Sequence, residues 1–211
     1  MVAVARMSWS AAAAEVARRD PALGVVIERA GPARLRTKDP DGPFGALVRA
    51  IAYQQLAGKA AAAIHGRFRA LVPGPLTPES VLAVSEEAMR GAGLSRAKTV
   101  SIRDLSARAA GGELDLATLP RLPDDDIVAC LSEVRGIGRW TAEMFLLFEL
   151  RRLDVWPTGD LAVREGWRLA HGLELPPTPS QLQLLGEPLR PVRSVAACYC
   201  WQAVHIARGQ L

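Results

Sequence analysis

Apolar residues recur along the chain at the spacing of an α-helix face. From Phe44 onward they stand at Leu47, Val48 and Ile51, intervals of three and four that place them on one side of a helix. Stretches rich in proline and glycine, such as "KDPDGP" at 38–43, interrupt the pattern and mark loops. No long run alternates apolar and polar residues, and no Asn-Gly pair signals a β-hairpin. The pattern therefore predicts an all-α fold with roughly ten helices.

Residues that cap helices set the expected boundaries. Asp20-Pro21 starts one helix, with proline at the first helical position, where its missing N–H costs nothing. The stretch "LPPTPS" at 175–180 is expected to be a loop, and a last helix is expected from about Val192 to Ala207. Elsewhere a serine, threonine or aspartate precedes an apolar run as an N-cap: Ser10, Thr77, Ser85, Ser95 and Asp160.

Composition narrows the class of protein. The length of 211 residues suits one domain or two small lobes sharing a core. The net charge of +4 permits a polyanionic partner without demanding one, and the excess of arginine over lysine fits phosphate binding or a GC-rich genome equally. Cys130, Cys198 and Cys200 lack the C-x-x-C spacing of a zinc or iron–sulfur site. We expect reduced thiols in a bacterial cytoplasm, with no signal peptide and no membrane span.

The stretch "EVRGIGRWTAEMF" carries the strongest chemical signal. Gly136 and Gly138 allow positive φ and let another molecule approach the backbone closely. The helix that follows begins with amides at the positive end of its dipole, and Arg135 and Arg139 add charge beside them. This arrangement suits phosphate and is blind to base sequence. The alternative is a turn between two helices with no ligand.

Together, "LSEVRGIGRWTAEMFLLF" and the downstream "WPTGDLAVREG" resemble the helix-hairpin-helix DNA glycosylases, and among them the AlkA-type 3-methyladenine DNA glycosylases. "LVRAIAYQQLAGKAA", "GLSRAKTVSI" and "LRPVRSVAACYCW" support the likeness, which covers about residues 43 to 208. The resemblance implies two helical lobes with a DNA-binding cleft between them. One would span 43–152 with the hairpin, and the other 1–42 plus 153–211 with the catalytic aspartate. The chain is too short for the extra N-terminal α/β domain of larger AlkA proteins, so we expect a minimal version.

The resemblance assigns the catalytic carboxylate to Asp160. Cleavage of an N-glycosidic bond develops positive charge on the sugar, which a carboxylate stabilises while it orients or deprotonates water. The simpler reading is a helix N-cap. Bifunctional relatives carry a Schiff-base lysine where this chain has Trp140, and Lys38, Lys59 and Lys98 lie elsewhere in the sequence. Trp140 could instead stack on a cationic base or pack into the core.

Other roles follow from the same resemblance. Gln55 or Leu56 would plug the gap left by a flipped base, although a helix end with two solvated glutamines is an equal reading. Tyr53 and Met144 would line the base pocket. The family's hairpin also holds a monovalent cation through main-chain carbonyls, and no other cofactor is implied. The remaining assignments are DNA contacts at Gly136, Gly138, Arg139 and Thr141, and cation ligands at Ser132, Val134 and Ile137.

The chain departs from the family at three positions: Arg135 replaces a common proline, and Met144 and Val192 stand where relatives can place aromatic rings. We therefore expect a less aromatic pocket. The predicted function is a monomeric, monofunctional glycosylase that flips out and excises alkylated bases such as 3-methyladenine and 7-methylguanine from double-stranded DNA. The alternatives are a non-catalytic DNA-binding module, a glycosylase/lyase, or a mismatch glycosylase with an iron–sulfur cluster. Asp160 favours an enzyme, and the missing hairpin lysine and cysteine spacing disfavour the last two.

Overall fold

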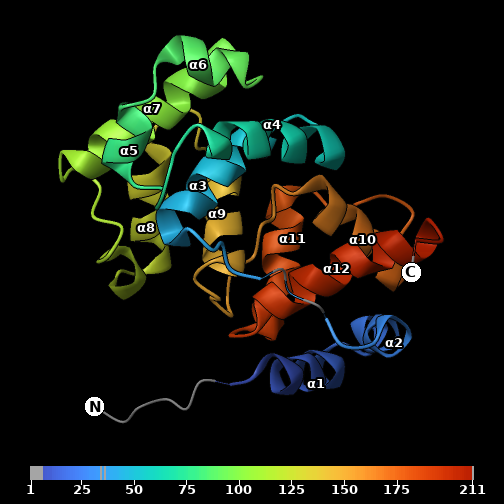
Figure 1. Cartoon of the computed structure of the whole chain (residues 1–211). Helices are drawn as coiled ribbons and strands as arrows, with labels where there is room; N and C mark the ends of the chain where they lie inside the picture. The colour runs from blue at the N-terminus through green and yellow to red at the C-terminus, as the bar shows by residue number, and fades with distance from the viewer. Residues whose placement is uncertain (1–6, 34, 36, 211) are drawn as a thin grey trace. The chain divides into compact units, whose positions relative to one another are not determined.

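The computed structural model describes residues 7–33, 35 and 37–210, and regular structure in this part of the chain is entirely helical (Figure 1). The prediction of an all-α fold is confirmed. The chain divides into two compact units, Thr37–Leu150 and a second made of Met1–Arg36 with Arg151–Leu211. Among the described residues no helix is both long and apolar enough to cross a bilayer.

The central unit, Thr37–Leu150, holds seven α-helices and one short 3-10 helix, Leu119–Arg121. The apolar face that begins at Phe44 lies in its core, where Leu47, Val48 and Ile51 are fully buried. Burying each such side chain stabilises the fold by about 1.5–3 kcal/mol. The α-helices are α3 (Gly42–Tyr53), α4 (Gly58–Ala70), α5 (Pro78–Leu82), α6 (Glu86–Gly91), α7 (Arg96–Ala110), α8 (Asp124–Ser132) and α9 (Arg139–Phe148).

The terminal unit is built around α12 (Arg193–Ala207), whose residues from Arg193 to Cys200 are all buried. Burial on every side of its first two turns places this part of the helix inside the core. Its own Tyr199 lies in the same core cluster as Trp156 and Trp167. The other elements of this unit are α1 (Trp9–Arg19), α2 (Pro21–Ala30), α10 (Leu161–His171), α11 (Pro179–Gly186) and a 3-10 helix, Glu187–Leu189.

Close packing joins α10 to α12 at Gly166. A Cβ built on Gly166 would collide with the backbone carbonyl of Cys200, so only glycine allows this approach. The contact matters because α10 begins directly after Asp160 and α12 carries Trp201. The spacing of the two helices therefore decides how these two residues meet.

A charged pair fastens α2 to α10. His171 Nε2 lies 2.9 Å from a carboxylate oxygen of Asp20, and its Nδ1 lies 2.9 Å from the carbonyl of Trp167. Both partners are acceptors, so the protonated ring, which carries hydrogen on both nitrogens, satisfies both contacts. Burial alone would lower the pKa of His171, but the bonds to Asp20 and Trp167 raise it. The ring also stacks on Trp167 at 4.1 Å, a geometry that favours a cation.

Two boundary predictions were wrong. The N-cap of α1 is Ser8, whose Oγ accepts the amide hydrogen of Ala11, and Ser10 is already helical. The stretch expected as a loop at 175–180 contains the start of α11. Thr178 and Gln181 form a capping box there, each side chain bonded to the other's backbone amide. Such a box is visible in sequence as Thr-x-x-Gln, but the three prolines beside it concealed the signal.

Candidate functional site

The hairpin joins α8 to α9 through a tight turn. Gly136 has φ of 81°, the left-handed value that glycine adopts freely. Gly138 does not take this conformation: its φ is −95°, and it serves as the extended N-cap of α9. The backbone does not require glycine here, because it is extended and no atom lies within 4 Å of a built Cβ, but glycine leaves the helix start without a side-chain cap. The amides that open α9 therefore meet no side chain of their own N-cap.

Three side chains of the same unit hold the turn. Gln54 Nε2 donates to the carbonyl of Gly136 at 2.8 Å. Asp104 on α7 accepts from the amide of Arg135 at 2.8 Å. Ser101, also on α7, packs so closely under Gly136 that a Cβ at Gly136 would strike its hydroxyl. The hairpin backbone is thus fixed from several sides.

The two arginines at the hairpin differ in their pairing. Arg139 Nε donates to Glu143 Oε1 at 3.0 Å, and its guanidinium lies 3.8 Å from Asp125. Arg135 is exposed and makes no ion pair with any residue the structure describes. The positive charge open to an anion at this turn therefore belongs mainly to Arg135, whereas the sequence drew attention to Arg139.

The first turns of α9 carry the candidate pocket residues. Trp140 is 49% exposed, so it does not pack into the core as the alternative reading required. Met144 follows one turn later and is partly buried, which puts both on one helix face. Thr141 is buried, and its hydroxyl lies 3.5 Å from Gln54 Nε2. Only the backbone of Thr141 is therefore suited to a DNA contact.

The loop between α3 and α4 holds the remaining candidates of this unit. Gln55 has φ of 55°, an uncommon value for a residue with a side chain. Leu56 is 41% exposed. One face of Tyr53 is covered by the guanidinium carbon of Arg49, 4.9 Å from the ring centre, and His65 meets the ring edge-on at 6.0 Å. A cationic base could not stack on the face that Arg49 covers.

Asp160 belongs to the terminal unit and caps α10, as its sequence position predicts. It is only 8% exposed. Its Oδ1 accepts the amide hydrogens of Ala162 and Val163 at 2.8 and 2.9 Å, and Trp201 Nε1 donates to the same atom at 3.3 Å. The positive end of the helix dipole also favours a negative charge here. The carboxylate is therefore held in one orientation before any ligand arrives.

The buried thiols beside this site are not nucleophiles. Burial raises the pKa of Cys198 to about 12. Burial also raises the pKa of Cys200, and the nearby charge of Asp20 adds to the effect. Since the thiolate is the reactive form, both cysteines stay protonated and inert.

The candidate cation ligands are the carbonyls of Ser132, Val134 and Ile137. Val134 and Ile137 have buried side chains, which pin their backbone, and the Val134 carbonyl already accepts the amide hydrogen of Ile137 at 3.0 Å. Neutral carbonyl oxygens suit a hard cation rather than zinc or iron. No group of three or more histidine, cysteine or acidic residues that could hold a metal occurs in the described part of the chain.

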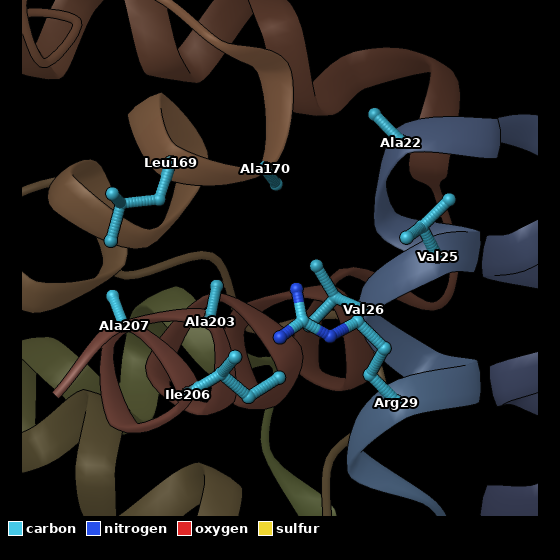
Figure 2. A pocket seen from close by; sticks show the side chains of 9 residues that line it. All are labelled: Ala22, Val25, Val26, Arg29, Leu169, Ala170, Ala203, Ile206 and Ala207. Atoms are coloured by element: carbon cyan, nitrogen blue, oxygen red, sulfur yellow. The ribbon is translucent and has the colours of Figure 1, made fainter. Parts of the chain in front are cut away.

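A separate groove lies at the other end of α10 (Figure 2). Its volume is about 360 Å³, and Arg29 is its one charged lining residue. Leu169 and Ala170 line it from the last turn of α10, about 14 Å along the helix from Asp160 at 1.5 Å per residue. The groove is therefore not the site of Asp160.

Sequence reasoning missed the partners that position these groups. Gln54 and Trp201 lay inside stretches that carry the family resemblance, yet neither had an assigned role. Each reaches its partner across a long sequence separation, 82 residues for Gln54 and 41 for Trp201. On α7, Ser101 and Asp104 show a three-residue spacing that could have flagged a shared helix face.

Comparison with known proteins agrees with these features. A model of the HhH-GPD superfamily of base excision DNA repair proteins matches residues 48–191. DNA-3-methyladenine glycosylase 1 of Schizosaccharomyces pombe is 35% identical over 175 residues, 82% of this chain and 77% of the relative. The crystal structure of a DNA-3-methyladenine glycosidase from Bacillus halodurans superposes with a TM-score of 0.84 at 37% identity, over 93% of this chain and 91% of the other.

A second solved structure shows a relative with nucleic acid. The 3-methyladenine DNA glycosylase of Schizosaccharomyces pombe, in complex with abasic DNA, has a TM-score of 0.81 at 33% identity. The match covers 90% of this chain and 94% of that one. The chain belongs to the HhH-GPD superfamily of base excision DNA repair proteins.

Proposed function

We propose that this protein is a monofunctional DNA glycosylase that excises alkylated bases from double-stranded DNA. The observation that carries the proposal is Asp160, a buried carboxylate whose Oδ1 is held by two amides and an indole N–H. Its relatives are named 3-methyladenine glycosylases. A module that only binds DNA has no need of such a preorganised charge.

Asp160 supplies the electrostatic part of the reaction. As the bond between sugar and base breaks, positive charge develops on the sugar, and a fixed carboxylate stabilises it without having to reorganise. The same group orients water, or accepts its proton, for attack on the sugar. An alkylated purine such as 3-methyladenine already carries positive charge, so it departs with little help from an acid.

The hairpin binds the DNA backbone. The backbone amides at the start of α9 and the charge of Arg135 are suited to a phosphate. Contacts to phosphate fix the protein on the duplex without reading sequence. Gln55 or Leu56, both exposed in the α3–α4 loop, would fill the space from which the damaged base is flipped.

The reaction stops after base release. Trp140 stands where a lyase carries its lysine, and an indole cannot form a Schiff base. Lys98 is committed elsewhere, because its Nζ donates to the carbonyl of Ala52 at 2.8 Å. Borohydride should therefore trap no covalent protein–DNA adduct, and abasic sites should stay uncut.

Trp140 would give base recognition a preference for positive charge. Its half-exposed ring offers a face on which a cationic base can stack, while Met144 beside it reads little of the base edge. We expect ready release of 3-methyladenine and 7-methylguanine, and poor release of neutral lesions such as 8-oxoguanine and uracil. A preference for a neutral lesion would reject this assignment.

The hairpin carbonyls of Ser132, Val134 and Ile137 would hold a monovalent cation that adds positive charge beside the bound phosphate. At constant ionic strength, affinity for DNA should be higher in potassium or sodium chloride than in tetramethylammonium chloride, whose cation is too large for a carbonyl cage. We also expect a monomer at working concentrations, acting in the cytoplasm on the nucleoid.

The deciding experiment measures free bases released from methylated calf-thymus DNA by the purified protein. Release of 3-methyladenine with an intact sugar–phosphate backbone is the expected result. Tight DNA binding without release would leave the non-catalytic module as the function.

A further inference from the structure

One side chain fastens the α3–α4 loop to the hairpin. Gln54 Nε2 donates to the carbonyl of Gly136 at 2.8 Å and lies 3.5 Å from the hydroxyl of Thr141. Gly136 is the left-handed residue of the turn, and Thr141 belongs to the first turn of α9. A single amide group therefore touches both sides of the phosphate-binding backbone.

The next two residues of the same loop, Gln55 and Leu56, are exposed, and the proposed function assigns entry into DNA to them. Gln54 and Gln55 form the centre of a tight turn closed by the amide of Leu56, which donates to the carbonyl of Tyr53 at 3.4 Å. Gln55 takes the left-handed position that usually requires glycine or asparagine. Such a conformation persists only where the surroundings hold it, and it often marks a functional segment.

Helix α7 braces the loop and the hairpin together. Lys98 Nζ donates to the carbonyl of Ala52 in the last turn of α3, and Asp104 accepts from the amide of Arg135. Ser101, midway between them, packs under Gly136. The three residues are spaced three apart, so they share a face of α7. The end of α3 and the hairpin are bonded to this common face, and Gln54 joins the loop that follows α3 to the hairpin.

We propose that Gln54 is a positioning residue that sets where the α3–α4 loop stands relative to a phosphate held by the hairpin. The inference rests on the proposed function. Phosphate binding fixes the hairpin on the duplex, and the bond from Gln54 to Gly136 then fixes the entry point of Gln55 and Leu56. Loss of that bond leaves the phosphate contacts intact but lets the loop stray, so that base flipping and excision become slower.

The role requires a hydrogen-bond donor. A glutamate at this position has the same shape, but its ionised carboxylate can only accept and would face the Gly136 carbonyl with no hydrogen between them. Once protonated, the same group can donate again. In Gln54→Glu the hydrogen bond to Gly136 therefore forms only when the new carboxyl is protonated, at low pH. In Gln54→Leu it is absent at every pH.

The test compares both variants with the wild-type protein and with Gln183→Leu as a control. Gln183 bonds Glu187 within α11 of the terminal unit. For Gln54→Leu we expect affinity for undamaged duplex within about twofold of wild type, and single-turnover excision slower by roughly 3- to 10-fold, the range that one uncharged hydrogen bond supplies. Fluorescence of 2-aminopurine placed beside the lesion should show a matching loss of base flipping. Melting temperatures of all variants are measured alongside.

The pH series makes the test independent of a folding defect, because Gln54→Glu is compared with itself. Between about pH 8 and pH 5 its excision rate, divided by the wild-type rate, should rise toward one as the new carboxyl is protonated. The same ratio for Gln54→Leu should stay flat.

Three results would overturn the inference: wild-type excision by Gln54→Leu, an equal loss of binding and excision, or a flat ratio for Gln54→Glu. Failure of the proposed function appears separately, as absence of base release by the wild-type protein itself.

Discussion

The hairpin and the Asp160 loop each lead into the N-terminus of a helix, where the helix dipole is positive. The two N-termini differ in the residue that caps them. At α9 the N-cap is Gly138, which places no side chain over the first amides. At α10 the N-cap is Asp160, whose carboxylate occupies the amides of Ala162 and Val163. One helix start leaves room for an anion from outside, and the other carries an anion of its own.

The difference separates binding from chemistry. A phosphate recruited to α9 needs only open amides and a close approach, which glycine provides. A catalytic carboxylate must be present and correctly oriented before the substrate arrives, and burial with three donors to Oδ1 achieves that at α10. Removing the carboxylate at α10 should therefore impair catalysis, and adding a carboxylate at α9 should impair DNA binding.

Removal of the charge at α10 should produce the largest effect. Asp160→Asn keeps an oxygen that can cap Ala162 and Val163, so the fold should survive. Base release should fall by about 100- to 1000-fold, because the developing charge on the sugar loses its counter-charge. Single-turnover excision and equilibrium DNA binding are measured on the same preparation. Activity within a few-fold of wild type would remove Asp160 from the mechanism.

Supplying an anion at α9 should block binding instead. Gly138 has the extended backbone of an ordinary N-cap and free space around its Cβ, so Gly138→Asp and Gly138→Ser should both fold, with stability changed by only a few tenths of a kcal/mol. Gly138→Asp should weaken binding to duplexes of any sequence by about 10- to 100-fold, since charged hydrogen bonds to phosphate are lost. The uncharged Gly138→Ser is the matched control and should lose less. Equal affinities across all three proteins would show that phosphate does not bind this helix start.

Removing one of the hydrogen bonds that orient the Asp160 carboxylate should slow excision by a smaller factor. Trp201→Phe keeps the ring beside Asp160 but removes the N–H that donates to Oδ1. Excision should slow by roughly 3- to 10-fold, the worth of one hydrogen bond, with DNA binding unchanged. Single-turnover rates on 7-methylguanine oligonucleotides provide the measurement. Unchanged rates would mean that the two amides of α10 orient Asp160 without the indole.

Local signals in the sequence predicted the parts of the site that depend on neighbouring residues. Asp160 was predicted as an N-cap because a capping side chain acts within three residues, and the structure confirms it. The glycine turn before α9 was recognised for the same reason, and Gly136 takes the positive φ that glycine allows, whereas Gly138 is extended. The N-cap of α1 at Ser8 was missed, since both Ser8 and Ser10 satisfy the same local rule.

The positioning contacts could not be predicted because they join residues far apart in sequence. The bond from Gln54 to Gly136 and that from Trp201 to Asp160 depend on how helices pack, and packing is set by details such as the absence of a side chain at Gly166. The ion pairs of the hairpin arginines also depend on the fold. Arg139 was the arginine assigned to DNA binding from the sequence, but in the fold it pairs with Glu143 and Asp125. Arg135 is exposed and is therefore the hairpin arginine more accessible to an anion.

The smallest expected effect is on the pH dependence of stability, to which one histidine in each unit contributes with opposite sign. In the terminal unit, bonding to Asp20 and Trp167 raises the pKa of His171 despite its burial. Its contribution to stability is therefore full below its unfolded pKa near 6.5 and is lost as pH rises through the folded value. In the central unit, burial lowers the pKa of His65, among the charges of Asp39, Asp41, Arg49 and Arg69. Its neutral form carries no penalty above pH 6.5, and stability falls as pH drops toward the folded value.

Removing each histidine should reveal these opposite slopes. His171→Gln should lower the melting temperature mainly at slightly acid pH, and the loss should shrink as pH rises. His65→Gln should remove a destabilisation that grows on acidification, so its melting temperature relative to wild type should climb as pH falls. Each kcal/mol corresponds to about 2–4 °C for a chain of this size. Calorimetric melts of the three proteins between about pH 5 and 8 would test both signs, and parallel curves would show that neither ring changes its protonation on folding.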